Sequence, residues 1–213
     1  FNEKMIITNF DIYNYDIRLS KNIGIFFSIL CILLFVNALN LFDGINLQSS
    51  LYGLFCLTFL IFRGLFFEII LIIIIPLLLI IYLNNKNKTF MGDSGTLFLG
   101  SIISLIVIAN YTKTNFLTTD EIFLLMFLPG MDMLRLFIER ILHGKNPFIG
   151  DREHLHHYFV RLYSYRFSIS SIFAISTLPL LINLFTRSEF VIIFFTIFYF
   201  LLLVFLKKKS TKR

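Results

Sequence analysis

Residues 69–83 read IILIIIIPLLLIIYL, and this stretch decides the fold class. It is apolar throughout, and it lacks the alternation with period two that marks a strand of a membrane barrel. The stretch therefore predicts part of a membrane-spanning helix. Pro76 lies at its centre, where a proline bends a transmembrane helix without ending it.

Six further apolar runs are separated from this one by polar clusters. Together they predict seven spans, at residues 23–40, 50–62, 65–83, 95–111, 121–142, 168–185 and 190–206. The composition agrees, because 57% of the residues are hydrophobic and only 15% are charged. These values exclude an ordinary soluble domain, a disordered chain and a disulfide scaffold. We expect residues 1–213 to form one integral-membrane domain, an all-α polytopic bundle of transmembrane helices.

The basic residues predict the orientation of this bundle. With seven spans, twelve Lys and Arg residues fall in one set of loops and six in the other. The positive-inside rule then places the first set, which includes the C-terminal tail, in the cytoplasm. The net charge of +6 is mostly this topology signal. No nucleic-acid partner is expected, because the basic residues have no separate soluble face.

Three segments on the predicted cytoplasmic side are unusually polar: residues 37–50, 86–100 and 143–162. In the first, four polar residues are spaced by three, namely Asn37, Asn40, Asp43 and Asn46. On a helical turn this spacing puts them roughly on one face, which can form the wall of a cation or phosphate site. Alternatively, the segment is a polar helix end in which Asp43 and Gly44 form a turn.

In the second segment, Asp93 and Ser94 precede an apolar run. One interpretation is that either residue caps a helix. The other is that Asp93 is a carboxylate at the membrane boundary, beside a helix N-terminus that attracts phosphate. A hard carboxylate in that place suits Mg²⁺, which leaves room for phosphate oxygens.

The third segment gathers three of the four histidines of the chain, His154, His156 and His157, near Lys145 and Arg152. These side chains supply positive charge and hydrogen-bond donors, so they can clamp a pyrophosphate. The alternative is an amphipathic basic loop held against anionic headgroups. Zinc is a poorer interpretation, because the His-x-His-His spacing matches none of the usual helical metal sites.

The predicted span 121–142 carries three ionisable residues, Asp132, Arg135 and Glu139, on one helical face. Ionised groups inside a span are costly, so they face the interior of the bundle and mark a function or an ion pair. An internal Asp132–Arg135 pair is favoured over a direct role in substrate binding.

The three polar segments also carry a resemblance to a known family. The sequences NALNLFDGIN (37–46), FMGDSGTLFLG (90–100) and PGMDMLRLFIERILHGKNPFIGDREHLHHYFVRL (129–162) resemble motifs of the polyprenyl-phosphate N-acetylhexosamine-1-phosphate transferases, glycosyltransferase family 4. The bacterial branch loads GlcNAc-1-phosphate or a related sugar phosphate onto undecaprenyl phosphate. In the related phospho-MurNAc-pentapeptide transferase three histidines are usually adjacent, so His-Leu-His-His favours the N-acetylhexosamine branch.

The chain departs from this family in its number of spans and in two motifs. Members have about ten or eleven spans, and they carry an Asp-Asp-x-x-Asp motif, whereas no Asp-Asp pair occurs here. The chain also begins at Phe1 instead of a Met. We therefore expect an N-terminally incomplete chain, inactive by itself. Leu47 stands where the family usually has a glycine, which puts the local backbone shape in question.

The resemblance implies a Mg²⁺-dependent (or Mn²⁺-dependent) phosphotransferase. In the family reaction, an oxygen of undecaprenyl phosphate attacks the β-phosphorus of a UDP-N-acetylhexosamine and UMP leaves, which initiates synthesis of a cell-envelope polysaccharide. The residues implied in catalysis are Asp43, Asp93 and His154. The implied metal ligands are Asn40 and Asp93. The residues implied in substrate binding are Asn37, Asn46, Lys145, Arg152, His156 and His157.

The resemblance also implies a location and partners. We expect a multi-pass protein of the bacterial inner (plasma) membrane, with the active-site loops, the C-terminus and a His-rich loop at residues 143–167 in the cytoplasm. A homodimer is left open. Two other classes compete, a membrane transporter or channel and a non-catalytic relative that binds lipid phosphate. Transport sites lie near the middle of the membrane, whereas the polar residues here gather at one side.

Overall fold

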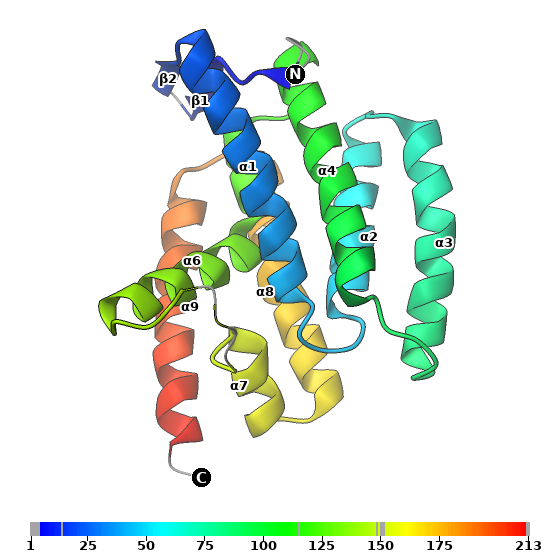
Figure 1. Cartoon of the computed structure of the whole chain (residues 1–213), viewed down its shortest axis with the longest axis vertical. Helices are drawn as coiled ribbons and strands as arrows, with labels where there is room; N and C mark the ends of the chain where they lie inside the picture. The colour runs from blue at the N-terminus through cyan, green and yellow to red at the C-terminus, as the bar shows by residue number, and fades with distance from the viewer. Residues whose placement is uncertain (1–4, 14, 115, 148, 150–151, 212–213) are drawn as a thin grey trace.

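The computed structural model describes residues 5–13, 15–114, 116–147, 149 and 152–211. Within these residues the chain forms nine helices and one short hairpin (Figure 1). The elements are β1 (Asn9–Ile12), β2 (Tyr15–Arg18), α1 (Lys21–Phe42), α2 (Gln48–Phe62), α3 (Phe67–Asn85), α4 (Gly92–Thr114), α5 (Thr119–Leu125), α6 (Phe127–Leu142), α7 (Leu155–Leu162), α8 (Tyr165–Thr186) and α9 (Phe190–Ser210). The all-α expectation is confirmed apart from the hairpin, which no sequence pattern predicted.

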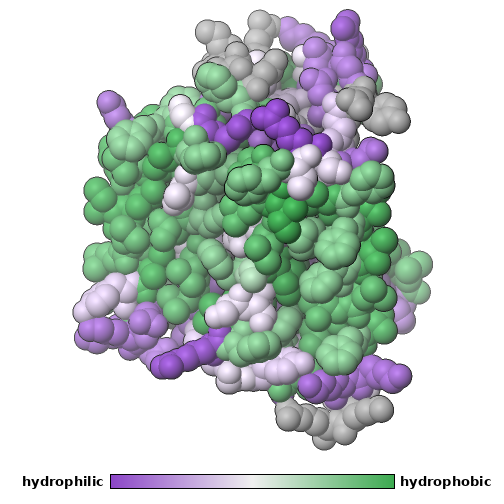
Figure 2. All heavy atoms as spheres, turned by 180° about the vertical axis from the view of Figure 1, so that it is seen from behind, coloured by the Kyte–Doolittle hydropathy of each residue, from purple (hydrophilic) through white to green (hydrophobic). Residues whose placement is uncertain are grey.

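Five helices in the described part of the chain are long and apolar enough to cross a membrane: α1, α3, α4, α8 and α9. Large apolar side chains on them stay exposed, for example Ile72 at 71% and Phe194 at 62%. On the face seen in Figure 2, they form an apolar belt between polar bands at the two ends of the bundle. Such a belt is stable in hydrocarbon, so the protein is a multi-pass membrane protein.

The predicted number of seven spans is not confirmed. α2 has 15 residues, which is shorter than a full span. α3 continues through Pro76, as predicted. The predicted span 121–142 is wrong as a single helix, because it is divided at Met126 into α5 and α6.

The break between α5 and α6 follows from Pro129. A proline ring collides with the carbonyl group four residues earlier, which here belongs to Leu125, the last residue of α5. The hydroxyl group of Tyr52, from α2, donates a hydrogen bond to the carbonyl oxygen of Leu125. This hydrogen bond from α2 stabilises the break between α5 and α6.

α6 runs across the bundle in Figure 1, whereas α1, α8 and α9 run along it. One side of α6 carries the charged residues Asp132 and Arg135, which are buried. A lipid-facing span cannot carry ionised groups cheaply. The crosswise helix instead turns them toward α7 and α9, as their hydrogen bonds with Leu155 and Tyr199 show.

The close packing of α1 on α4 brings the first two polar segments together. A β-carbon added at Gly100 of α4 would lie 3.2 Å from the Cα atom of Val36 in α1, so glycine is what lets the two backbones approach. The end of α1, the start of α4 and the short helix α7 all lie at one end of the bundle. This is the lower end in Figure 1. We call this the site end.

Candidate functional site

Asn40 joins the last turn of α1 to the first turn of α4. Its side-chain amide donates to Oδ1 of Asp93 at 3.2 Å and to the hydroxyl oxygen of Thr96 at 2.8 Å. The Thr96 hydroxyl is also within hydrogen-bond distance, 3.0 Å, of the carbonyl oxygen of Gly92. These contacts fix the position of the Asp93 carboxylate, which remains exposed at the site end.

Asp43 follows α1 directly and lies half-buried close to the same turn of α4. The hydroxyl of Ser49 and the backbone N–H of Gly92 donate to its carboxylate. Burial raises the pKa of the Asp43 carboxyl, and the charge of Asp93 raises it further, whereas the two hydrogen bonds act in the opposite direction. Neighbouring carboxylates that repel each other in this way favour the binding of a cation.

The residues present fit the predicted magnesium site. Mg²⁺ prefers oxygen ligands and is usually held by one or two carboxylates together with waters and phosphate oxygens. Asp43 and Asp93 offer such carboxylates. The nitrogen of the Asn40 amide is already used by Asp93 and Thr96, so Asn40 has only its side-chain oxygen left for a cation.

The expectation that four residues share one helical face is wrong, because α1 ends at Phe42. Asn37 and Asn40 belong to the helix, whereas Asp43 and Asn46 lie in the loop that follows. Asp43 reaches the site through this loop and not through helical spacing. The alternative of a polar helix end with a turn at Asp43 describes the backbone better.

The two outer residues of this series point elsewhere. Asn37 is exposed, and its amide donates to the carbonyl oxygen of Leu33 in its own helix at 2.7 Å. Asn46 donates to Oδ1 of Asn87 at 3.2 Å. Asn46 therefore ties the loop after α1 to the loop before α4, and its role in substrate binding stays a prediction, as does that of Asn37.

Leu47 adopts a left-handed backbone, with φ of 71° and ψ of −18°. This is a conformation that glycine adopts readily and that costs other L-residues about 1–2 kcal/mol. The chain thus keeps the backbone shape expected of a glycine at this position, with strain.

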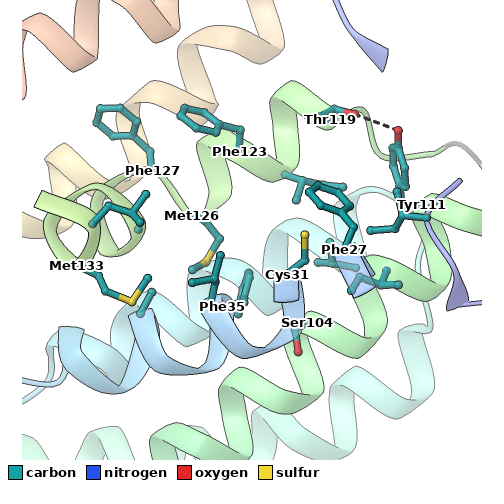
Figure 3. A pocket seen from close by; sticks show the side chains of 18 of the residues that line it. Phe27, Cys31, Phe35, Ser104, Tyr111, Thr119, Phe123, Met126, Phe127 and Met133 are labelled. Carbon is teal, nitrogen blue, oxygen red and sulfur yellow. Dashed lines mark hydrogen bonds between the residues drawn. The ribbon is translucent and has the colours of Figure 1, made fainter. Parts of the chain in front are cut away.

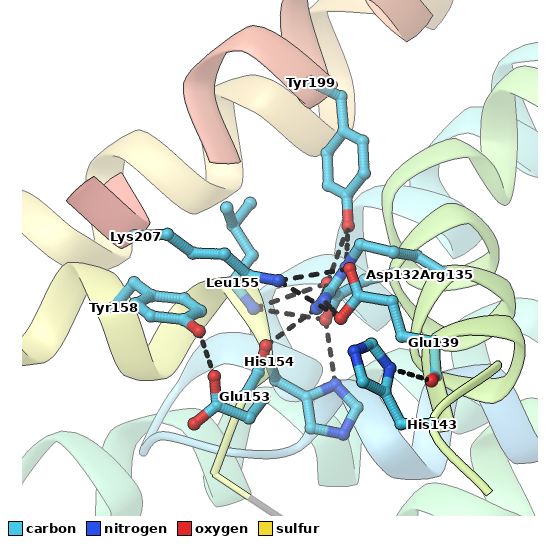
Figure 4. Close-up of polar contacts among 10 residues, drawn as sticks. All are labelled: Asp132, Arg135, Glu139, His143, Glu153, His154, Leu155, Tyr158, Tyr199 and Lys207. Atoms are coloured by element: carbon cyan, nitrogen blue, oxygen red, sulfur yellow. Dashed lines mark hydrogen bonds and ion pairs between the residues drawn. The ribbon is translucent and has the colours of Figure 1, made fainter. Parts of the chain in front are cut away.

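Four buried side chains from α6, α9 and the start of α7 form a network around Asp132 (Figure 4). Nδ1 of His154 lies 2.8 Å from Oδ2 of Asp132. Arg135 and the hydroxyl of Tyr199 both donate to Oδ1 of Asp132, at 2.8 and 2.7 Å. The predicted ion pair between Asp132 and Arg135 is confirmed, and it also contacts a predicted catalytic histidine.

The network extends to the surface through Glu139, which the helical spacing placed on the same face, and through Lys207, Glu153 and Tyr158, which no sequence pattern indicated. Glu139 accepts from Arg135 at 2.9 Å and from Lys207 at 3.1 Å. Tyr158 donates to Glu153. The one signal in the sequence was Tyr199, a hydroxyl-bearing residue within the apolar run 190–206. Its partners come from other helices, so the pattern around it could not reveal them.

His156 connects the third segment to the first. A β-carbon built on Gly44 would lie 1.7 Å from Nε2 of His156, so the imidazole ring packs directly on the Gly44 backbone. The ring also lies parallel to that of His154, with 5.3 Å between the centroids, and 4.2 Å from that of His157. The histidines and the loop of Asp43 therefore belong to one site.

His156 is held as a neutral ring. It is 3% exposed, and Nε2 has no hydrogen-bond partner among the described residues. Burial lowers the pKa of His156 to about 3, and the charges of His157 and His154 act in the same direction. Positive charge for a diphosphate therefore has to come from other residues.

The predicted binding residues Lys145 and Arg152 are exposed. Among the described residues, no ion pair joins either of them to Asp43 or Asp93. The backbone oxygen of Arg152 accepts from Arg161 at 2.9 Å. The predicted loop 143–167 contains α7 and the start of α8, and its residues 148, 150 and 151 lie outside the described residues, as does Phe1.

Asp132, His154 and His156 have ligand atoms within 4.8 Å of one another, which can suggest a metal centre. The carboxylate of Asp132, however, already accepts from Arg135, Tyr199 and His154. Its charge is compensated by Arg135. These three residues therefore fit a metal ion poorly, in contrast to Asp43 and Asp93.

A cavity of about 360 Å³ lies between α1, α4, α5 and α6 (Figure 3). Its walls are almost entirely apolar, and they include Phe27, Phe35 and Met126. Met133 of α6 also lines it, next in sequence to Asp132 of the polar network. One helix thus separates an apolar cavity from the polar site.

Comparisons with known proteins identify relatives of this chain. The family described as glycosyl transferase family 4 matches residues 3–111, just over half of the chain. The undecaprenyl-phosphate alpha-N-acetylglucosaminyl 1-phosphate transferase of Escherichia coli K12 is 30% identical over 152 residues, which cover 65% of this chain and 41% of that protein. The protein of the same name from Yersinia pestis is 29% identical over 140 residues, 59% of this chain and 38% of its own.

A third relative with this name, from Haemophilus influenzae, is 34% identical over 77 residues, 36% of this chain and 22% of its own. The chain thus spans about two fifths or less of the length of these relatives. No solved structure gives a significant match. The match over residues 3–111 includes Asp43 and Asp93. The chain belongs to glycosyl transferase family 4.

Proposed function

We propose that this chain belongs to an enzyme that transfers an N-acetylhexosamine-1-phosphate from a UDP-sugar to undecaprenyl phosphate and releases UMP. The observation that supports it most is the meeting of Asp43, Asp93 and the His154–His156 pair at one end of a membrane bundle. The reaction starts synthesis of a cell-envelope polysaccharide. We place it at the cytoplasmic face of the bacterial plasma membrane, where the basic loops are expected.

The reaction has to bring two anions together, a lipid phosphate and a nucleoside diphosphate. Bound Mg²⁺ or Mn²⁺ would neutralise the charge that builds on the transferring phosphoryl group. Asp93 and Asp43, with the side-chain oxygen of Asn40, would hold this cation. Ser49 and Gly92 orient the Asp43 carboxylate for that purpose.

The apolar cavity supports a lipid acceptor. A polyprenyl chain needs apolar walls, and Phe35, Met126 and Met133 supply them beside α6. Because α6 lies between the cavity and the polar network, a chain seated there would have its phosphate near the site end. The name of the Escherichia coli relative likewise contains an undecaprenyl phosphate acceptor and an N-acetylglucosaminyl 1-phosphate group.

The location of the polar residues weighs against a transporter. Transport sites lie at the middle of the membrane, between helices that are interrupted in pairs. Here Asp43, Asp93 and His156 lie at the site end, in loops and first helical turns. A non-catalytic relative would bind the UDP-sugar without releasing UMP, so turnover separates it from the enzyme.

The test measures Mg²⁺-dependent release of UMP from UDP-GlcNAc by the intact protein in its native membranes, with undecaprenyl phosphate added. Asp93→Asn should lower the rate at least a hundredfold. Glu68→Gln is the matched control, because Glu68 is an exposed carboxylate of the first turn of α3, at the opposite end of the bundle. Wild-type turnover in Asp93→Asn would contradict the metal assignment, and solute flux without UMP release would favour the transporter.

A further inference from the structure

Asp132 contacts the start of α7 in two ways. Its Oδ2 atom lies 2.8 Å from Nδ1 of His154, and it accepts the backbone N–H of Leu155 at 3.2 Å. His154 is the N-cap residue of α7, yet its own side chain makes no capping hydrogen bond. Asp132 therefore takes the place of a capping side chain and fixes the imidazole ring at the same time.

The other oxygen of Asp132 is held by two donors. Arg135 donates to Oδ1 at 2.8 Å and the Tyr199 hydroxyl at 2.7 Å, and Nε of Arg135 donates to the Tyr199 oxygen at 2.9 Å. Asp132, Arg135 and Tyr199 are all at most 5% exposed. A carboxylate paired with arginine in this way is ionised and can only accept hydrogen bonds. The short contact with His154 then needs a proton on Nδ1.

We propose that Asp132 is the positioning residue of His154: it fixes a ring proton on Nδ1, so that the ring, when it carries one proton, presents Nε2 to the substrate as a hydrogen-bond acceptor. Figure 4 shows the Nε2 side of the ring turned away from the ion network. The identity of the substrate rests on the proposed function, but the state of the ring does not. In that form His154 acts as a hydrogen-bond acceptor.

The physical reason is that the two ring nitrogens are not equivalent. The hydrogen bond made by one nitrogen decides which tautomer the other presents. Without an acceptor at Nδ1, the proton can occupy Nε2, and the ring then offers a donor where an acceptor is needed. Loss of the Asp132 acceptor should therefore lower the turnover rate more than it weakens the binding of substrate.

The direct test is NMR of the purified full chain with ¹⁵N-labelled histidine. The chain has four histidines, so a His154→Gln variant identifies the signals of this ring. At a pH at which the ring carries one proton, we expect the Nδ1–H form of His154 in the wild type. In Asp132→Asn we expect the Nε2–H form or a mixture of the two. Glu121→Gln is the matched control, because Glu121 is also a buried carboxylate, but it lies on α5 and is paired with Arg63 at 3.0 Å.

The result that would overturn the proposal is a singly protonated wild-type His154 in the Nε2–H form, or an unchanged tautomer in Asp132→Asn. Should Asp132→Asn not fold, Tyr199→Phe tests the same network, because it removes one donor from Asp132 and should shift the Nδ1 proton resonance of His154. An unchanged resonance in Tyr199→Phe would contradict the proposal that Tyr199 acts on His154 through Asp132.

A kinetic measurement separates this proposal from the proposed function. Asp132→Asn should lower kcat at least tenfold with KM for the UDP-sugar within twofold of the wild type, whereas Glu121→Gln should change neither. A raised KM with unchanged kcat would contradict positioning. If the wild type shows the expected tautomer but releases no UMP, the proposed function fails and the assignment of the ring stands.

Discussion

The imidazole ring of His156 packs on the backbone of Gly44 so closely that a β-carbon at residue 44 would lie 1.7 Å from Nε2. The backbone of Gly44 does not have a positive φ, so the conformational freedom of glycine is not what this position uses. The imidazole ring of His156 occupies the space that a side chain at residue 44 would fill. This contact brings the loop after α1 and the start of α7 together.

Gly44→Ala should therefore destabilise the protein by about 1–3 kcal/mol, the usual cost of forcing an extra methyl group into a packed site. Thermal unfolding in detergent measures it. Gly130→Ala is the control, because a β-carbon there meets no atom within 4 Å. In the double variant Gly44→Ala, His156→Ala the clash between the new methyl group and the imidazole ring is gone. The loss of stability in the double variant should therefore be smaller than the sum of the losses in the two single variants. Additive effects would show that the contact is not formed.

Leu47→Gly should stabilise the protein, or leave its stability unchanged, despite the loss of a side chain. A glycine adopts the left-handed backbone at φ of 71° without strain. The relief of that strain should add about 1 kcal/mol to the free energy of unfolding. Leu51→Gly is the control, since Leu51 is also partly buried but lies inside α2. There a glycine should cost about 1 kcal/mol or more. Equal losses in both variants, measured by thermal unfolding, would contradict the strain at Leu47.

The protein should become less stable as the pH is lowered, because of His156. Its pKa is about 3 in the folded protein and about 6.5 in an unfolded chain, so the unfolded chain binds the proton more readily between these values. Unfolding is then favoured as the pH drops below about 6.5, by up to about 1.4 kcal/mol per pH unit. Unfolding temperatures between pH 8 and pH 5 measure this slope. His156→Asn should reduce it, and an unchanged slope in that variant would rule out His156 as the cause.

Tyr52→Phe should destabilise the protein by about 1–3 kcal/mol, because it leaves the carbonyl oxygen of Leu125 buried without its donor. Tyr82→Phe is the control, since Tyr82 is exposed and its hydroxyl accepts a hydrogen bond from the exposed Lys86 side chain. It should change stability by less than about 0.5 kcal/mol. Chemical or thermal unfolding of the two variants compares them, and similar losses would mean that the break between α5 and α6 does not depend on Tyr52.

Much of the site was predictable from local sequence. Asp43, Asp93 and His154 were selected by the polar segments and the family resemblance, and the structure brings the regions that contain them to one end of the bundle. The internal pair of Asp132 and Arg135 was predicted from helical spacing and is confirmed. Tyr199 was missed, because its partners lie on another helix and no local period connects them.

The errors have physical causes. The break at Met126 was missed because the hydrophobic pattern continues through it, although Pro129 was visible. The shared face of Asn37, Asn40, Asp43 and Asn46 was wrong because the helix ends at Phe42. Hydropathy reports how much of a segment avoids water, and it is insensitive to where a helix stops.

The sequence by itself determined that this is a multi-pass helical membrane protein of a particular transferase family, because long apolar runs can satisfy their backbone only as helices in lipid. It also determined which residue types are available for phosphate and metal chemistry. Only the tertiary structure decided that α6 lies crosswise, that His156 packs on Gly44 and that Asp132 receives donors from Tyr199 and Arg135. These are contacts between segments far apart in the chain, and they follow from packing, which no local pattern encodes.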